Sequence, residues 1–182
     1  SSYIPTTSST VTRAADTLTV PAANLPYSST NMSIQMDGRM TWADENISVD
    51  KTMFSWTGDA SNFIRGYMDT GGALTGRVVL QSKASGVDDF SAKGSDDYTA
   101  GANVAFNISS RHGSSFLNHA TDGTALTANT TPTALPNLSS STLSLGFDFM
   151  GTIAQFRVWD EDLTDTGIVT ASAPSTEPSL QL

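Results

Sequence analysis

The sequence predicts an all-β domain, built as a sandwich or a barrel. Ser and Thr make up roughly a quarter of the chain, whereas the helix formers Glu and Lys are scarce. Short runs of alternating polar and apolar residues recur along the chain, most of them bounded by Gly, Asp, Asn or Ser turn residues. No longer window repeats apolar residues at helical spacing, so no long amphipathic helix is expected. A chain of 182 residues fits one domain with a single core.

The clearest strand prediction covers 32–42. Apolar residues occupy almost every second position there and polar residues lie between them, which predicts one core face and one polar face. Gly38 interrupts the apolar face, and a β-bulge is expected at that point. The apolar face consists of Met32, Ile34, Met36, Met40 and Trp42. Further strands are predicted over 52–57, 62–69, 77–82, 103–111 and 142–145.

The last third of the chain predicts a hairpin, a strand and a short turn. Asp122-Gly123 favours a two-residue hairpin, because a type I′ turn needs positive φ at both central positions. Alternation over 151–158 predicts a strand. Thr164 is a candidate N-cap, but Gly167 is a poor helix former, so a short or irregular turn is expected. The side chains expected in the core are Ile34, Met36, Phe106, Ile108, Phe156 and Val158.

Charge and composition exclude several function classes. Nine Lys and Arg against eighteen Asp and Glu give a net charge of −9, which repels phosphate backbones, so nucleic acid is an unexpected partner. No apolar run approaches the roughly 18 residues of a membrane-spanning helix, so no membrane insertion is expected. Cys is absent, which removes disulfides, thiolate nucleophiles and Cys-ligated zinc.

The second half of the chain carries a family resemblance. NVAFNISSR at 103–111 is followed by FLNHATDGTAL at 116–126, LSLG at 143–146 and GTIAQFRVWDEDLTDTGI at 151–168. This succession resembles the closing half of laminin-G-like, concanavalin A-like domains. The resemblance implies a two-sheet antiparallel jelly-roll sandwich. TDTGI departs from the more helical acidic segment usual in that family, so the resemblance does not support a terminal helix.

The opening stretch carries a second resemblance. SYIPTTSSTVTRAAD, at 2–16, is similar to the segment that leads into laminin-G-like domains of bacteriophage and prophage virion proteins. This implies a lead-in at 1–20 that joins an upstream module and pairs as a first strand, the sandwich at 21–170, and a Pro-containing tail or linker at 171–182.

The two resemblances imply a non-enzymatic recognition or decoration domain of a virion, assembled in the host cytoplasm. The expected partners are other virion subunits, a host-surface glycan and, as a homo-oligomer, further copies of the chain. Two alternatives stay open at this stage. One is a polysaccharide hydrolase or lyase on the same fold, and the other is a purely structural virion domain.

Catalytic constellations are not apparent in the sequence. Glycoside hydrolases on this fold use paired Glu residues on one strand, but Glu45, Glu161 and Glu177 are not so arranged. Consecutive Asp160, Glu161 and Asp162 would point apart in a strand. No Gly-x-Ser-x-Gly elbow accompanies Ser114 or Ser115, and His112 and His119 are interpreted as structural. Arg111 and Arg157 are candidates for ion pairs or sugar contacts, or for covering apolar surface.

The segment from Gly86 to Asn103 is the leading candidate for a ligand site. It combines clustered carboxylates with two aromatic rings, a combination suited to calcium-assisted sugar binding on a rim loop. The alternatives are a solvated turn and a hairpin anchored by its aromatic residues. The ligand-binding candidates are Asp88, Asp89, Phe90, Asp97, Tyr98 and Asn103. The candidate calcium ligands are Asp88, Asp89, Asp96 and Asp97.

Overall fold

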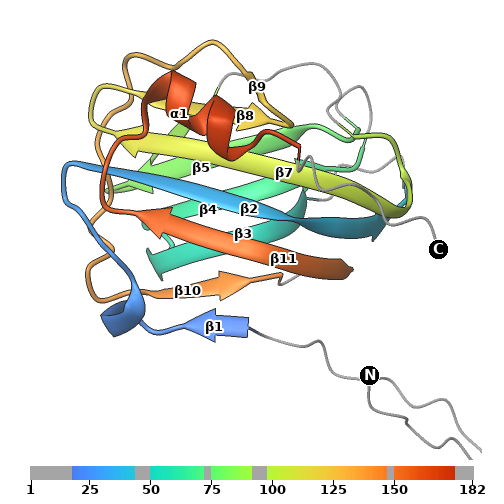
Figure 1. The fold of residues 1–182 in the computed structure, drawn as a ribbon. Helices are drawn as coiled ribbons and strands as arrows, with labels where there is room; N and C mark the ends of the chain where they lie inside the picture. The colour runs from blue at the N-terminus through green and yellow to red at the C-terminus, as the bar shows by residue number, and fades with distance from the viewer. Residues whose placement is uncertain (1–17, 44–49, 72–74, 92–97, 147–149, 175–182) are drawn as a thin grey trace, which may run out of the picture.

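The protein is a sandwich of two antiparallel sheets with a jelly-roll architecture (Figure 1). The computed structural model describes residues 18–43, 50–71, 75–91, 98–146 and 150–174. One sheet contains, in spatial order, β1 (Leu18–Val20), β10 (Thr142–Leu145), β3 (Asp50–Asp59), β4 (Asn62–Asp69), β5 (Val78–Ala84) and β6 (Val87–Phe90). The other contains β11 (Gly151–Trp159), β2 (Asn31–Trp42), β7 (Gly101–Gly113), β8 (Leu117–Thr121) and β9 (Thr124–Ala125). All seven strands predicted from 32–42 onward are present.

The core lies between the two sheets. The predicted apolar face of β2 is buried, and its register places Met36 opposite Ile108 of β7. Phe54 of β3 meets Phe156 of β11 edge to face across the sandwich, with ring centroids 5.7 Å apart. Phe156 and Val158 are only partly buried, because β11 is an edge strand. These two side chains, expected in the core, therefore pack against it without being fully buried, whereas Ile34, Met36, Phe106 and Ile108 are buried as predicted.

One turn and one β-bulge follow from local sequence. Asp122 and Gly123 both have positive φ, 46° and 82°, and join β8 to β9 as the type I′ preference predicts. The expected bulge lies at the level of Gly38, but its extra residue belongs to the partner strand β11, between Ile153 and Gln155. Gly38 is needed there because a Cβ would lie 2.0 Å from the carbonyl oxygen of Thr152.

The C-terminal turn is longer and more regular than expected. α1 (Thr164–Ala171) is an eight-residue helix packed against the outer face of the five-stranded sheet (Figure 1). Ile168, a residue of this helix, is fully buried. The helix and the segment before it also cover the polar face of β2, so Ser33 and Gln35 are buried rather than solvated. Tertiary contacts thus override the weak helix propensity of Gly167.

The remaining short element is a 3-10 helix, η1 (Ala22–Asn24), between β1 and β2. β1 pairs with β10, so the end of the expected lead-in at 18–20 lies in the sheet. Residues 1–17 and 175–182 lie outside the described residues, as do most of the expected lead-in and tail. Within the described part of the chain, no helix has the length and apolar character that crossing a bilayer requires.

Candidate functional site

The expected loop site is divided between two faces of an edge strand. Asp88 and Asp89 are neighbours in β6, so their side chains point to opposite sides of the sheet. Asp88 is exposed, accepts a hydrogen bond from Nε2 of Gln81 (2.6 Å) and pairs with Nζ of Lys83 (3.3 Å). Asp89 is buried and accepts a hydrogen bond from the amide of Thr133 (2.8 Å). The two carboxylates therefore do not converge on one point.

The aromatic residues of the same segment are structural. Phe90 is half-buried in β6, and its carbonyl oxygen accepts a hydrogen bond from Nδ2 of Asn129. Tyr98 belongs to the core cluster, which leaves its ring unavailable as a sugar platform. Asn103 is exposed with φ of 59°, and its amide donates to Oγ1 of Thr41 (3.0 Å).

Calcium binding at this loop stays a prediction. Asp96 and Asp97 lie outside the described residues. Among the residues that the structure does describe, no three His, Cys, Asp or Glu side chains gather closely enough to hold a metal ion.

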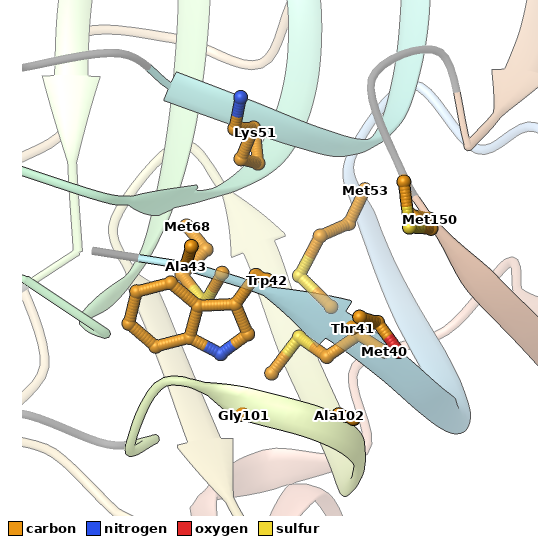
Figure 2. Close-up of a pocket in the computed structure, with 10 residues that line it drawn as sticks. All are labelled: Met40, Thr41, Trp42, Ala43, Lys51, Met53, Met68, Gly101, Ala102 and Met150. Atoms are coloured by element: carbon orange, nitrogen blue, oxygen red, sulfur yellow. The ribbon is translucent and has the colours of Figure 1, made fainter. Parts of the chain in front are cut away.

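A cavity of about 470 Å³ opens beside the C-terminal end of the predicted segment, at one rim of the sandwich (Figure 2). It lies where the end of β2 and the start of β7 approach β3 and β4 of the other sheet. Its volume falls within the range of small-molecule sites, roughly 300–1,000 Å³. We call it the rim pocket, and its lining residues are Met40, Thr41, Trp42, Ala43, Lys51, Met53, Met68, Gly101, Ala102 and Met150.

Local sequence explains why the strand ends leave a hollow here. A register shift separates Met40 from Trp42, and the residue paired with Trp42 on β7 is Gly101, which has no side chain to fill the space. The indole ring also packs close to Gly76, whose added Cβ would lie 3.4 Å from the ring and 1.9 Å from the carbonyl oxygen of Tyr98. Two glycines therefore make room for one large side chain at the rim.

The pocket has a floor of methionines and the indole of Trp42 in its lining. Met40, Met53 and Met68 are almost fully buried, whereas Met150 is 69% exposed and lies at the mouth. Figure 2 shows the side chains of Met40 and Met53 directed toward the indole of Trp42. Trp42 is 8% exposed, and its buried Nε1 has no hydrogen-bond partner among the described residues. Buried indole N–H groups are usually paired, so this one is an exception among the described residues, but the atom itself has almost no accessible surface and the indole contributes its ring to the pocket.

The two histidines are core residues and form no catalytic triad. Nε2 of His112 lies 3.0 Å from Oγ of Ser110, and Nδ1 of His119 lies 2.8 Å from Oγ of Ser91. Burial lowers the pKa of His112 to about 3, with a smaller effect of His119, and lowers the pKa of His119 to about 4. Both imidazoles are therefore neutral and inaccessible at neutral pH, as their structural interpretation predicts.

Arg111 and the acidic segment after β11 hold the helix against the sheet. The Arg111 guanidinium donates to both carboxylate oxygens of Asp162 (2.7 and 2.6 Å) and to Oδ1 of Asp165 (2.8 Å). It also stacks on the ring of Phe116, 4.0 Å from the centroid. Asp160 and Glu161 are exposed, and Arg157 is an exposed residue of β11. Arg111 is thus an ion-pair residue, the first of the three roles considered for it.

A second polar cluster lies on the outer face of the six-stranded sheet, and the sequence did not indicate it. The guanidinium of Arg65 lies 4.6 Å from the ring centroid of Tyr67 and 5.6 Å from that of Phe63. It also donates hydrogen bonds to Gln81 and Asp50. Because the guanidinium of Arg65 already has hydrogen-bond and ring contacts, we interpret this cluster as a structural network on the surface. The rim pocket is the better candidate for a ligand site.

The sequence matches no protein-family model and no curated protein. The fold is similar to that of solved carbohydrate-related proteins. The Ruminococcus gnavus IT-sialidase CBM40, bound to α2,3-sialyllactose, superimposes with a TM-score of 0.61 at 11% identity, over 81% of this chain and 84% of that one. At this identity the likeness establishes the lectin-like β-sandwich fold.

Larger proteins contain a similar sandwich as one part. The NanB sialidase of Streptococcus pneumoniae matches with a TM-score of 0.63 at 13% identity, over 84% of this chain and 26% of that one. Botulinum neurotoxin type C, whose cell entry depends on interaction with two ganglioside molecules, matches with a TM-score of 0.59 at 12% identity, over 80% of this chain and 36% of that one. The chain therefore spans about a quarter of the sialidase and about a third of the toxin chain.

Proposed function

We propose that this domain is a non-catalytic carbohydrate-binding module whose ligand enters the rim pocket. The observation that carries the proposal is the hollow itself, which has a floor of methionines and the indole ring of Trp42 in its lining. Sugars bind to proteins through aromatic contact and a few placed polar groups, and Trp42 supplies an aromatic ring in the lining. The likeness to a sialyllactose-bound module over most of both chains supports the proposal.

The placement of the acidic residues favours binding over hydrolysis. Retaining and inverting glycosidases need two carboxyl groups facing one substrate bond. The described lining of the rim pocket includes no carboxylate. Elsewhere, Asp88 pairs with Lys83, Asp89 bonds to Thr133, and Asp162 is held by Arg111. Each of these carboxylates serves a structural contact, so we propose that the module holds a glycan without cleaving it.

The test is to block the pocket mouth without disturbing the core. Met150→Arg places a long charged side chain at an exposed position of the mouth, so we expect at least a tenfold loss of binding to whole cells or to purified surface polysaccharide. Val87→Arg, at an exposed apolar position on β6 outside the pocket, is the control and should bind as the wild type does. Equal binding by both variants would remove the rim pocket from the proposal.

The same assay tests the calcium prediction. Binding at the rim pocket is expected to survive EDTA, because its described lining offers no carboxylate ligand. Loss of binding with EDTA and in Asp96→Ala/Asp97→Ala would instead support a calcium loop between β6 and β7.

We also propose that the module belongs to a bacteriophage or prophage virion protein. The resemblance of SYIPTTSSTVTRAAD to virion lead-in segments supports this context, as does a fold suited to displaying a glycan site. The module would then assemble with other virion subunits in the host cytoplasm and recognise host-surface glycan from the particle. Antibody labelling of purified particles in electron micrographs tests this, and particles that never carry the label would refute it.

A further inference from the structure

A second hollow, of about 580 Å³, lies on the outer face of the five-stranded sheet, next to the segment that follows α1. We call it the sheet hollow. Asp37 and Arg39 line it, and on β2 they alternate with the buried Met36 and Met40, so their side chains point away from the core. The sheet hollow and the rim pocket have no described lining residue in common, so they are separate sites.

Small side chains explain why the sheet is hollowed at this level. The partner of Arg39 on β7 is the exposed Ala105, and Ala154 is the extra residue of the bulge in β11. Both alanines line the hollow, and each leaves space that a longer side chain would fill. Because the floor is built on paired strands, it is rigid and partly apolar.

One side of the sheet hollow is held in place by hydrogen bonds. Nδ2 of Asn107 donates to the carbonyl oxygens of Ala171 and Ala173, at 3.2 and 3.0 Å. These bonds attach the end of α1 and the residues after it to β7. Pro174 follows directly and lines the hollow, so its ring adds apolar surface beside the floor.

Two carboxylates and one guanidinium lie at fixed positions in this lining. Asp37 of β2 pairs with Asn107 of β7, and the amide of Asn107 donates to Oδ1 of Asp122 (3.0 Å). Asp37 and Asp122 therefore lie in one row across the sheet, with their Cα atoms two strand spacings, about 10 Å, apart. Arg39 is exposed two positions along β2 from Asp37, and its Nη1 donates to the carbonyl oxygen of Asn103 (3.2 Å). The hollow thus presents charged acceptors and a charged donor to one ligand.

We infer that the sheet hollow binds a neutral sugar residue through its hydroxyl groups. A hydroxyl both donates and accepts, so neighbouring hydroxyls of one ring donate to the carboxylates of Asp37 and Asp122 and accept from Arg39. The C–H face of the ring packs on the alanines and Pro174. This inference rests on the proposed glycan-binding function and gives that function a second site outside the rim pocket.

The charge of the lining favours a neutral sugar over an acidic one. The charged side chains of the described lining are Asp37, Asp122 and Arg39, which together carry one net negative charge. A sialic or uronic acid would bring a further carboxylate beside two others, at an electrostatic cost. A divalent cation would be attracted by the carboxylates but repelled by Arg39. A neutral sugar meets both signs of charge without either penalty.

The test follows alanine and methionine methyl groups in one NMR titration. In protein labelled with ¹³C at these methyl groups, Ala105 and Ala154 report on the sheet hollow, whereas Met53 and Met68 report on the rim pocket. The probes are the methyl glycosides of glucose, galactose and mannose, each compared with the methyl glycoside of the uronic acid of the same configuration. At least one neutral glycoside is expected to shift Ala105 and Ala154 and to bind about fivefold or more tightly than its uronic acid.

Two variants locate the binding. Asp37→Asn keeps the side-chain shape and removes the charge, so it should weaken the neutral glycoside and reduce its advantage over the uronic acid, a ratio that a merely structural role would not change. Asp160→Asn, the same substitution at an exposed position outside the hollow, is the matched control and should keep both affinities. Ala105→Phe fills the floor and should abolish the shift of Ala154. Circular dichroism and the unfolding midpoint establish that each variant is folded.

The outcomes separate the inference from the proposed function. If glycosides shift Met53 and Met68 alone, or shift neither pair, the inference is wrong, while the Met150→Arg assay on whole cells still decides the proposed function. Uronic acids that bind as tightly as neutral glycosides would also overturn it. A shift of Ala105 with calcium chloride alone, which then blocks the glycoside, would assign the carboxylates to a metal instead. Release of free sugar from the glycosides would contradict both the inference and the non-catalytic function.

Discussion

The free energy of unfolding of this domain is expected to fall by about 4 kcal/mol between pH 8 and pH 5, because two histidines are buried in the neutral state. A change of this size is a large part of the roughly 5–15 kcal/mol by which most domains are stable. His112 lies on β7 and His119 on β8, and both side chains face the core. The loss of stability between pH 8 and pH 5 is therefore expected to come mainly from the burial of these two imidazoles.

The sign follows from where protons bind. In the unfolded chain each imidazole takes up a proton near pH 6.5, its ordinary pKa. In the folded state burial lowers the pKa of His112 to about 3 and that of His119 to about 4. As pH falls below 6.5 the unfolded state binds more protons than the folded state, so stability is lost. The slope approaches about 1.4 kcal/mol per pH unit for each histidine, and most Asp and Glu side chains titrate below this window.

Urea unfolding at a series of pH values measures this slope, and two variants assign it. His112→Gln and His119→Gln keep a neutral polar side chain and remove one titrating group each, so each should lower the slope between pH 6 and pH 5 by about half. The slope is informative even when a variant is less stable overall. A wild-type stability that stays constant over this range would contradict the burial of neutral histidines.

The strands were predictable because alternation in a half-buried strand reflects one physical constraint. The apolar positions from Met32 to Met40 must face the core, and a slip of one residue would expose all of them. β6 was missed because it is a four-residue edge strand with two Asp residues, one of which is exposed and charge-paired with Lys83. Edge strands need only one partner, so they carry little sequence signal.

The helix α1 could not be predicted from propensity. Gly167 disfavours a helix, but its missing Cβ allows close packing, since an added Cβ would lie 2.8 Å from Cβ of Leu163. The contacts that stabilise the helix come from Arg111 and Asn118, about fifty residues away in the sequence. Long-range contacts of this kind have no local pattern.

The rim pocket was only partly visible in the sequence. Met40 and Trp42 were correctly expected on the core face of β2, whereas none of the predicted ligand residues from Asp88 to Asn103 lines the pocket. The pocket forms because Met53, Met68 and Met150 reach the same point from three other segments. Isolated methionines separated by many residues do not indicate a cavity. The unpartnered state of Nε1 of Trp42 is a property of the folded surroundings alone.

Arg111→Ala is expected to destabilise the domain by about 2–4 kcal/mol and to release α1 from the sheet. The substitution removes three charge-assisted hydrogen bonds and leaves Asp162 partly buried without its cation. Hydrogen bonds from Asn118 and from Arg111 also lower the pKa of Asp165, so part of the acid stability of this region depends on the same clamp. The stability that these contacts of ionised Asp165 contribute is present at neutral pH. It is lost as the pH falls through the folded-state pKa of Asp165.

The measurement is urea unfolding together with hydrogen exchange of the α1 amides. Arg157→Ala removes an exposed arginine from β11 of the same sheet and should change stability by less than about 0.5 kcal/mol. Arg111→Lys keeps the charge but lacks the planar fork that holds both oxygens of Asp162, so it should recover only part of the loss. If Arg111→Ala proves as harmless as Arg157→Ala, with α1 amides equally protected, the helix is held by the burial of Ile168 rather than by the ion pairs.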